Sequence, residues 1–510
     1  MSVVQRVALG FAAGVALASV AVAQRPARPN ILFIFADDHA SHAISAYGST
    51  IIKTPHIDRL AREGMLFRLA FVTNSICAPS RATVLTGQFG HLNGVPTNSE
   101  PLHPTTLTFP KLLRANGYQT AVLGKWHLKT LPTADAFDHF EVVNDQGDYY
   151  NPLFMRPRDT VRVEGYATEI ITDRALEWMR TRDQSRPFML MLQHKAPHRP
   201  WQPGPAQLGM FEGTRFPEPT TLFDDWSGRA SPARTQEMTI ARHLDDDDLK
   251  LVAPRNLTPA QLERWNAAYD APNAAFRSRQ LESDALVRWK YQRYIADYVR
   301  VVSSIDDNVG RVLEYLDRSG LARNTIVIYS SDQGFFLGDH GWFDKRWMYE
   351  ESLRTPLLVR WPGVVRPGSV NQDLVQNLDY AETMLEMAGA AVPREMQGRS
   401  LVPLLRGQTP RDWRDAIYYQ YFEYPSWHMV RRHYGVRTKR YKLIHYYEVN
   451  EWELFDLEKD PRELRSVYGD AAYASVKGSM EQRLRELREQ YRVPATDPVP
   501  YRPWPPPQAR

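Results

Sequence analysis

Four short apolar runs in this chain each end in a cluster of charged or amide side chains. Runs of this kind are typical of buried β-strands, and the amphipathic helical stretches between them predict a largely parallel sheet covered by helices. Ligand sites in such sheets lie beyond the carboxyl ends of the strands, so we expect the clusters to meet. The runs and the residues that follow them are 31–35 with Asp37 and Asp38, 119–123 with Lys125 and His127, 188–193 with His194, Lys195 and His198, and 325–330 with Asp332 and Gln333.

The carboxylate and amide members of these clusters make an all-oxygen set, which suits a hard cation. Ca²⁺ fits this set best because it accepts about six to eight oxygen ligands in flexible geometry, and Mg²⁺ is the alternative. The sequence has no thiolate or imidazole ligands in a zinc-like spacing, which argues against zinc. The expected ligands are Asp37, Asp38, Asp332 and Gln333, the last through its side-chain carbonyl.

Basic residues would surround this cation with positive charge. Lys125, Lys195 and several histidines follow the predicted strands, and Arg81 and Lys345 lie in other segments. Such a setting would hold a small, highly charged anion such as sulfate or phosphate. One cluster alone would be explained better as a surface loop, but four together favour a site. The acidic run 245–248 is expected to be a solvated loop.

Cys77 is the only cysteine among the 510 residues. It opens the run Cys77-Ala78-Pro79-Ser80-Arg81, in which a proline followed by a helical pattern predicts the start of a helix. A helix N-terminus carries unpaired backbone N–H groups and the positive end of the helix dipole, where an anion would be held. Taken alone, Cys77 is explained equally well as a small buried apolar residue.

The first 23 residues are typical of a secretory signal peptide, with one positive charge, a short apolar stretch and an Ala-Val-Ala cleavage site. The stretch is shorter than the roughly 20 residues that span a bilayer, so no membrane anchor is expected after cleavage. An exported chain without disulfides fits a bacterial periplasm or exterior. The net charge of +4, from 63 basic and 59 acidic residues, argues against nucleic-acid binding through bulk charge.

In its ordered motifs the chain resembles the formylglycine-dependent sulfatases of the alkaline-phosphatase-like superfamily. Residues 77–81 match the C-x-P-x-R signature of that family and continue into Ala82-Thr83-Val84-Leu85-Thr86-Gly87. The resemblance covers residues 29 to about 468, and the ordered set is far more specific than one short motif. The other motifs that fall in the family's order are Asp37-Asp38, Gly124-Lys125-Trp126-His127-Leu128, Pro197-His198, Ser331-Asp332-Gln333-Gly334 and Lys345.

The resemblance implies a chemistry for Cys77. A formylglycine-generating enzyme would oxidise it to formylglycine (3-oxoalanine), and the aldehyde would be hydrated to a gem-diol. One hydroxyl, held on Ca²⁺, would attack the sulfur of a sulfate ester on a carbohydrate, and the other would later expel sulfate as the aldehyde re-forms. This route avoids the second displacement that a sulfate ester on an ordinary alcohol would need.

The resemblance also implies a role for each basic residue of the site. Arg81 and Lys125 would hold the formylglycine hydrate, and His127 would be the base that starts its collapse. His198 would protonate the leaving alcohol, and Lys345 would clamp a sulfate oxygen.

The metal ligands implied by the family are the four oxygen-bearing residues named above together with the modified Cys77. Gln333 departs from the family pattern, in which Asn or His is common at this position. The longer amide can still offer its oxygen, so the departure bears on ligand geometry more than on metal binding.

The implied fold is α/β, with a large, mostly parallel sheet flanked by helices and a smaller C-terminal antiparallel sheet with a closing helix. Strand-like runs over 416–422, 434–437 and 441–446 and a helical stretch over 471–491 agree with this. The expected division is a signal peptide at 1–23, a catalytic α/β domain at 24–365, an α+β subdomain at 366–493 and a Pro-rich tail at 494–510.

Within the family, the segments 194–199, 338–345 and 428–437 look most like the glucosamine-6-sulfatase group. This implies removal of 6-O-sulfate from N-acetylglucosamine or glucosamine in heparan, keratan or mucin-type glycans. Rival functions are a sulfatase for iduronate, galactose or aryl sulfate, and a phosphonate or phosphodiester hydrolase, which shares the nucleophile and much of the metal site.

Four residues are substrate-binding candidates. His194 and Lys195 follow the third predicted strand, so they would lie beside the site or contact the substrate. His428 and His433 lie close to Trp427, where a sugar could be stacked and hydrogen-bonded. A packed aromatic loop is the equal alternative for this second pair.

Overall fold

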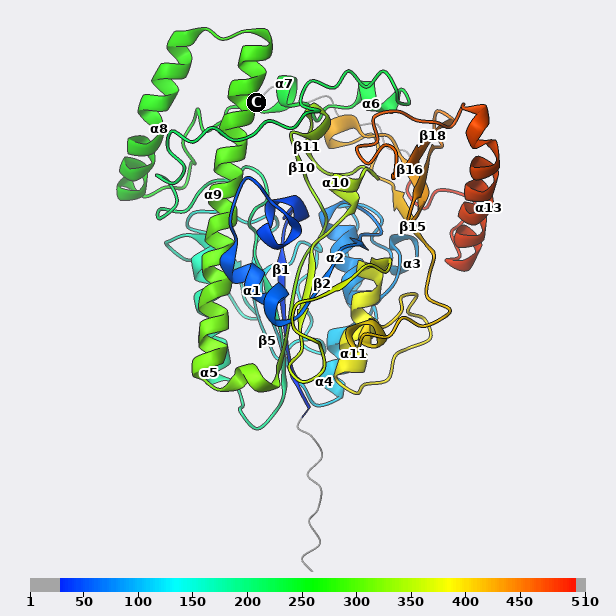
Figure 1. Cartoon of the computed structure of the whole chain (residues 1–510). Coiled ribbons are helices and arrows are strands. Elements are labelled where there is room, and N and C mark those ends of the chain that lie inside the picture. Colours follow the sequence, from blue (N-terminus) through cyan, green and yellow to red (C-terminus); the bar gives the residue numbers. More distant parts are fainter. Residues whose placement is uncertain (1–27, 501–510) are drawn as a thin grey trace, which may run out of the picture.

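A ten-stranded sheet runs through the middle of the computed structural model, which describes residues 28–500 (Figure 1). The predicted signal peptide and the last ten residues of the tail lie outside the described residues. The five central strands are parallel, as the alternation of strands and helices predicts, and the outer strands make the sheet mixed. The order across the sheet is β13 (Ser369–Asn371), β2 (Met65–Phe67), β12 (Leu357–Arg360), β9 (Thr325–Ser331), β1 (Asn30–Ala36), β8 (Phe188–Gln193), β4 (Gln119–Lys125), β5 (His139–Val143), β6 (Leu153–Met155) and β7 (Thr160–Arg162).

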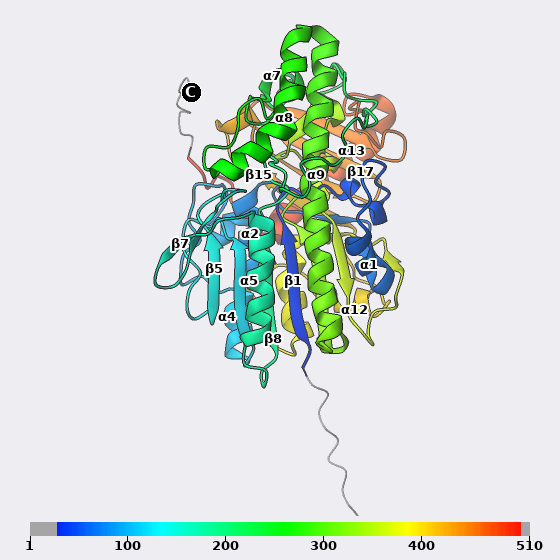
Figure 2. The ribbon, with the colours of Figure 1, turned by 90° about the vertical axis from the view of Figure 1, so that its left-hand side faces the viewer.

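Helices cover both faces of this sheet because the central strands are apolar on both sides. In β1, Leu32 and Ile34 face one helical layer, while Phe33 and Phe35 face the other. Figure 2 shows α5 and α9 lying along the first face. That layer holds α1 (Pro55–Glu63), α5 (Ala167–Thr181) and α9 (Ser283–Arg318), and the second holds α2 (Cys77–Thr86), α4 (Phe109–Ala115), α11 (Tyr380–Met387) and α12 (Val402–Leu405).

The longest helix, α9, is one arm of a hairpin with α8 (Pro259–Arg279) that rises above the sheet (Figure 1). The Thr258 side chain caps α8 by accepting from the backbone N–H of Gln261, and the Gln261 side chain accepts from the backbone N–H of Thr258. The amphipathic stretches 57–63, 108–116, 167–182 and 291–319 predict helices at the positions of α1, α4, α5 and α9, whereas α8 was not predicted. The remaining short helices are α3 (Gly90–Asn93), α6 (Pro232–Thr235), α7 (Ile240–His243) and α10 (Glu350–Leu353).

The smaller antiparallel sheet and its closing helix are present as expected. Strands β15 (Ala416–Tyr421), β16 (His433–Thr438), β17 (Tyr441–Tyr446) and β18 (Glu451–Asp456) follow one another in space. Helix α13 (Ala474–Gln490) packs its apolar face on this sheet. Two further strand pairs are β10 (Phe336–Leu337) with β11 (Phe343–Asp344), and β14 (Val375–Gln376) with β3 (Ala70–Phe71).

The large unit continues past residue 365, where the sequence places the end of the catalytic domain. Strand β13 pairs with β2, and helices α11 and α12 pack on the large sheet. These three elements follow residue 365 in the chain, so the C-terminal sheet begins about fifty residues later, at β15. No helix in the described part of the chain is long and apolar enough to cross a bilayer.

Candidate active site

Neighbouring parallel strands place three carboxylates at one point. The register between β1 and β9 pairs Ala36 with Ser331, so Asp37 and Asp332 leave the sheet side by side. The backbone N–H of Asp38 donates to Asp332 Oδ1 at 3.1 Å. One oxygen from each of the three carboxylates lies within 4.8 Å of the others, and all three residues are buried.

Burial and proximity move the protonation of these carboxylates in different directions. Burial raises the pKa of Asp38 to about 6 and raises that of Asp332 well above its usual range. Burial would also raise the pKa of Asp37, but Lys125 and the neighbouring His198 and Arg81 hold it well below its usual range. Three buried carboxylates this close together make a set of oxygen ligands that suits a divalent cation.

Gln333 adds one more oxygen to this cluster. Its Nε2 donates to the Asp38 carboxylate, while its Oε1 is buried and has no hydrogen-bond partner among the described residues. A buried amide oxygen without a donor is destabilising unless something else binds it, and a hard cation would do so. The oxygen set predicted from the sequence therefore fits a hard cation such as Ca²⁺ or Mg²⁺.

Cys77 is the first residue of α2, and its side chain points at this acidic cluster. Its Sγ lies 3.5 Å from Asp37 Oδ1 and 3.9 Å from Lys125 Nζ. Burial raises the pKa of the thiol, and the Asp37 carboxylate raises it further. The unmodified side chain is therefore a neutral thiol and a poor nucleophile in this position.

Arg81 lies one helical turn after Cys77 and so faces the same way. Its guanidinium binds Asp332 through Nε at 3.1 Å and through a terminal nitrogen at 2.9 Å. The other terminal nitrogen donates to Gln193 Oε1 at 2.8 Å and to the carbonyl of Lys125 at 3.0 Å. Arg81 thereby joins three strand ends to the start of α2.

Lys125 and His127 are linked by a residue that the sequence does not reveal. Lys125 Nζ donates to the Asp37 carboxylate and, at 2.6 Å, to Gln146 Oε1. Gln146 Nε2 lies 3.0 Å from His127 Nε2. Gln146 belongs to the loop after β5, where no motif or composition marks it.

His198 and Lys345 both lie next to the Asp38 carboxylate. Lys345 Nζ donates to Asp38 Oδ2 at 2.6 Å, and His198 Nε2 lies 3.8 Å from the same oxygen. Burial and the ammonium groups of Lys125 and Lys345 lower the pKa of His198 well below its usual range. Its side chain is 14% exposed, more than those of Arg81, Lys125, His127 and Lys345, which are 3% exposed or less.

The acidic run 245–248 is not wholly solvated, contrary to the prediction. Asp248 is buried and accepts two hydrogen bonds from Arg199, both at 2.6 Å, and Asp245 adds a third at 3.1 Å. The charges of this run are therefore used to hold Arg199, the residue after His198.

The structure puts the four substrate-binding candidates in different surroundings. Lys195 Nζ lies 4.8 Å from the ring centroid of Tyr149, and burial next to Lys125 lowers its pKa to about 7. His194 is buried, and neither ring nitrogen has a hydrogen-bond partner among the described residues. His428 holds Asp344, the neighbour of Lys345, at 2.9 Å.

His433 lies inside the aromatic core of the C-terminal subdomain. It is fully buried, and its Nδ1 lies 2.8 Å from the carbonyl of Arg431. Packing of this kind matches the aromatic-loop alternative, and it leaves no surface of His433 for a sugar. The rings around it are those of Trp347, Tyr419, Tyr421 and Tyr446.

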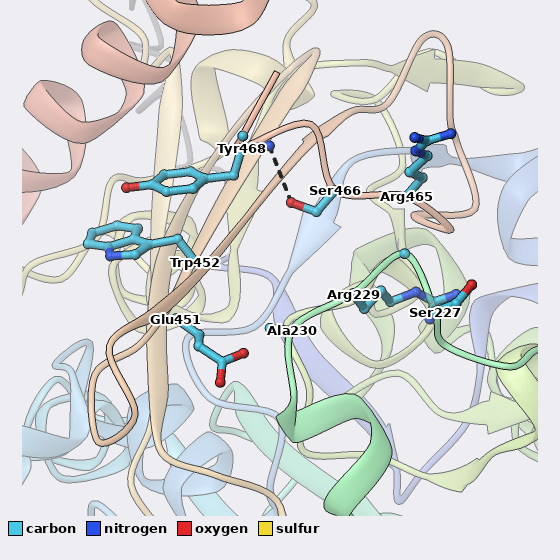
Figure 3. Close-up of a pocket in the computed structure, with 10 residues that line it drawn as sticks. Ser227, Arg229, Ala230, Glu451, Trp452, Arg465, Ser466 and Tyr468 are labelled. Atoms are coloured by element: carbon cyan, nitrogen blue, oxygen red, sulfur yellow. Dashed lines mark hydrogen bonds between the residues drawn. The ribbon is translucent and has the colours of Figure 1, made fainter. Parts of the chain in front are cut away.

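A surface hollow of about 350 Å³ between the 227–230 loop and the C-terminal sheet contains none of the predicted catalytic residues (Figure 3). The rings of Trp452 and Tyr468 lie parallel along one side, 5.6 Å apart between centroids. The His445 ring stacks on Trp452 with 3.7 Å between centroids, and Lys477 Nζ lies 3.9 Å from the ring centroid of Tyr468. Both rings are half-buried, and they pack on each other, on His445 and on Lys477.

Two sequence profiles match the chain. One described as Sulfatase covers residues 29–390, and one described as N-sulphoglucosamine sulphohydrolase, C-terminal, covers residues 338–490. The chain belongs to the sulfatase family. The predicted fold and enzyme class of this sulfatase, a sulfuric ester hydrolase, are thus confirmed.

Three relatives show where the sulfatase stands within the family. The N-acetylglucosamine-6-O-sulfatase of Bacteroides thetaiotaomicron is 45% identical over 504 residues, which cover 94% of this sulfatase and 90% of the relative. A solved structure in complex with its substrate D-glucosamine-2-N,6-O-disulfate has a TM-score of 0.91 and 45% identity, covering 92% of this sulfatase and 99% of that chain. The N-acetylglucosamine-6-sulfatase of Homo sapiens is 27% identical over 425 residues, or 78% of this sulfatase and 68% of the relative.

Proposed function

We propose that this sulfatase removes the 6-O-sulfate from N-acetylglucosamine or glucosamine in sulfated glycans of the heparan, keratan or mucin type. The observation that carries the proposal is the 45% identity to an N-acetylglucosamine-6-O-sulfatase over 94% of the chain. The relative whose substrate is D-glucosamine-2-N,6-O-disulfate, with its TM-score of 0.91, supports a glucosamine ring as the recognised unit.

The chain's own residues divide the work between holding the sulfate and moving protons. Lys345 clamps a sulfate oxygen, and Arg81 and Lys125 fix the side chain of residue 77. His198 is the most exposed of the basic residues around the carboxylates, so the sugar enters beside it and takes a proton from it as it leaves. The negative charge of the sulfate favours the protonated ring of His198, which offsets the effect of burial on its pKa.

Two groups complete the site. Asp37, Asp38, Asp332 and Gln333 would hold a divalent cation, proposed as Ca²⁺, which supplies positive charge to the nucleophile and to the sulfate. Formylglycine made from Cys77 by a formylglycine-generating enzyme would supply the hydrated aldehyde as that nucleophile. The predicted signal peptide supports a location in the periplasm or outside the cell, where the enzyme would encounter sulfated glycans.

The substrate is tested with a panel of sulfated monosaccharides and one phosphodiester. We expect desulfation of N-acetylglucosamine-6-sulfate and glucosamine-6-sulfate, but no release from iduronate-2-sulfate, galactose-6-sulfate or bis-4-nitrophenyl phosphate. The Cys77→Ala variant should show no turnover on any of them. Hydrolysis of another position while glucosamine-6-sulfate is untouched would show that the subgroup is wrong. Preferred hydrolysis of the phosphodiester would favour the rival hydrolase.

The two completing groups are tested on the protein itself. Mass spectrometry of the peptide that contains residue 77, from protein made in its native host, should show the aldehyde, and an unmodified thiol there would contradict the mechanism. Elemental analysis should find one Ca²⁺ per chain. Removing the metal with a chelator should abolish desulfation, and Ca²⁺ should restore it better than Mg²⁺. Full activity in the chelated protein would contradict the metal assignment.

A further inference from the structure

The loop that follows β5 places one amide between two of the site's basic residues. Gln146 Oε1 lies 2.6 Å from Lys125 Nζ, and Gln146 Nε2 lies 3.0 Å from His127 Nε2. The same side chain therefore contacts the lysine that binds Asp37 and the histidine two residues further along. No role is assigned to this residue by the motifs of the chain.

The identity of the partners fixes the direction of both hydrogen bonds. An ammonium group only donates, so the amide oxygen must face Lys125. The amide NH₂ group must then face His127, and because it also only donates, His127 Nε2 has to accept. A ring nitrogen that accepts carries no proton, so in a neutral imidazole the proton sits on Nδ1.

No other neighbour of His127 determines which of its ring nitrogens carries the proton. Nδ1 is buried and has no hydrogen-bond partner among the described residues, so nothing on that side selects a tautomer. The Asp145 carboxylate lies 3.5 Å from Nε2, but its side chain is 55% exposed and pairs with Lys129 at 3.1 Å. Burial and the ammonium of Lys125 lower the pKa of His127 well below its usual range, so the ring is neutral.

We propose that Gln146 is a positioning residue that selects the His127 tautomer with an unprotonated Nε2, the protonation state that a base at that nitrogen requires. The catalytic part of this inference rests on the proposed function, in which His127 acts as a base. The structural part, the tautomer itself, does not.

The substitution Gln146→Glu separates the two contacts. Glutamate has nearly the same shape and still accepts from Lys125, but its second oxygen cannot donate to His127. The ring must then present Nε2–H to the carboxylate. In protein labelled with ¹⁵N-histidine, the imidazole spectrum of the unmodified full-length wild type should show the proton of His127 on Nδ1. The spectrum of Gln146→Glu should show it on Nε2. The His127 signal is assigned by its loss in His127→Gln.

Activity measured on the metal-loaded, formylglycine-bearing protein is the second readout. We expect Gln146→Glu and Gln146→Met each to lower kcat by about 10²-fold, the usual share of a general base, with KM changed by less than about threefold. Asn144→Asp is the matched control, since it makes the same amide-to-acid change on an exposed side chain of the same loop, and it should match the wild type.

Three outcomes overturn the inference. The first is a wild-type tautomer with the proton on Nε2, and the second is an unchanged tautomer in Gln146→Glu. The third is a changed tautomer with full activity, because Nε2 would then not be the base. If no glucosamine sulfate is hydrolysed even by the wild type, the proposed function fails, and the spectra still decide whether Gln146 sets the tautomer.

Discussion

At the scale of single residues, the site depends on the geometry of donors more than on their charge. Arg81 uses all three of its nitrogens in hydrogen bonds or ion pairs, to Asp332, Gln193 and the Lys125 carbonyl, and it also pairs with Asp37 at 3.7 Å. A lysine at this position would carry the same charge on a single nitrogen and could not reach all of these partners. Arg81 therefore orients the helix start that presents residue 77.

The substitution Arg81→Lys should lower kcat/KM by about 10²-fold or more, because it loses at least two charge-assisted hydrogen bonds worth about 1.5–3 kcal/mol each. The measurement is the desulfation rate of N-acetylglucosamine-6-sulfate across a concentration series. Arg399→Lys is the control, since Arg399 pairs with Asp412 at the surface, and it should behave as the wild type. Equal activity in Arg81→Lys and wild type would show that charge alone suffices.

Site residues can be predicted from the sequence when the residue type implies a single chemistry. Asp37, Asp38 and Asp332 were predicted as an oxygen set, and the structure brings their carboxylates together. Gln146 could not be found in this way, because an amide in a loop after a strand has many uses and only its contacts show which applies. For His433 the residue type was misleading. A histidine in a predicted loop suggests substrate binding, but this one is buried in the core.

At the scale of elements, parallel strands explain why the clusters meet, but the supports around them come from less regular segments. The hairpin of β10 and β11 leads directly to Lys345, and the turn between its strands is held by His340. The His340 ring lies 3.1 Å from Asp224 and 3.6 Å from Glu351 in α10. Although burial lowers the pKa of His340, these two carboxylates outweigh it and raise the pKa to about 9.

Because the folded-state pKa of His340 is raised, protonation of this ring stabilises the fold below about pH 6.5 and the effect is lost as the pH rises through about 9. Asparagine at position 340 tolerates the left-handed backbone found there, where φ is 59°. Its amide does not gain a proton in this pH range, so His340→Asn removes the titrating group. The gap in Tm between wild type and variant should therefore be largest near pH 6 and should shrink by about pH 9.5. The exposed His103→Asn is the control, and a gap independent of pH would contradict the prediction.

Strands and helices could be predicted from the sequence where their apolar residues follow a clear periodic pattern. Strands β1, β4, β8 and β9 and helices α1, α4, α5 and α9 appear where the sequence predicts them, while the central strand β5 was not predicted. Helix α8 was missed because its apolar residues do not gather on one face, and only Trp265, Tyr269 and Asn273 of its side chains are buried. Strand β13 is three residues long and half exposed, so its pairing with the large sheet has no signal in its own sequence.

At the scale of the whole molecule, residues 497–499 are fastened to the loop that runs between β15 and β16 beside the site. Arg432 is 5% exposed and donates to Asp497 at 2.9 Å and to the carbonyl of Val499 at 2.8 Å. The hydroxyl of Tyr447 also donates to Asp497, at 2.6 Å. The same loop carries His428, which binds Asp344, so the tail and the site share one support.

The substitution Asp497→Ala should lower the free energy of unfolding by about 1–3 kcal/mol, because it leaves the buried guanidinium of Arg432 and the Tyr447 hydroxyl without this acceptor. The loop 422–432 should also be cut faster by trypsin, since Arg431 and Arg432 would be held less firmly. Urea unfolding and timed digestion of the full-length protein measure the two effects. Asp412→Ala removes an acceptor that is 80% exposed and should change the unfolding free energy by less than about 0.5 kcal/mol. If the two variants were equally stable and equally resistant, the tail would be lying on the loop without supporting it.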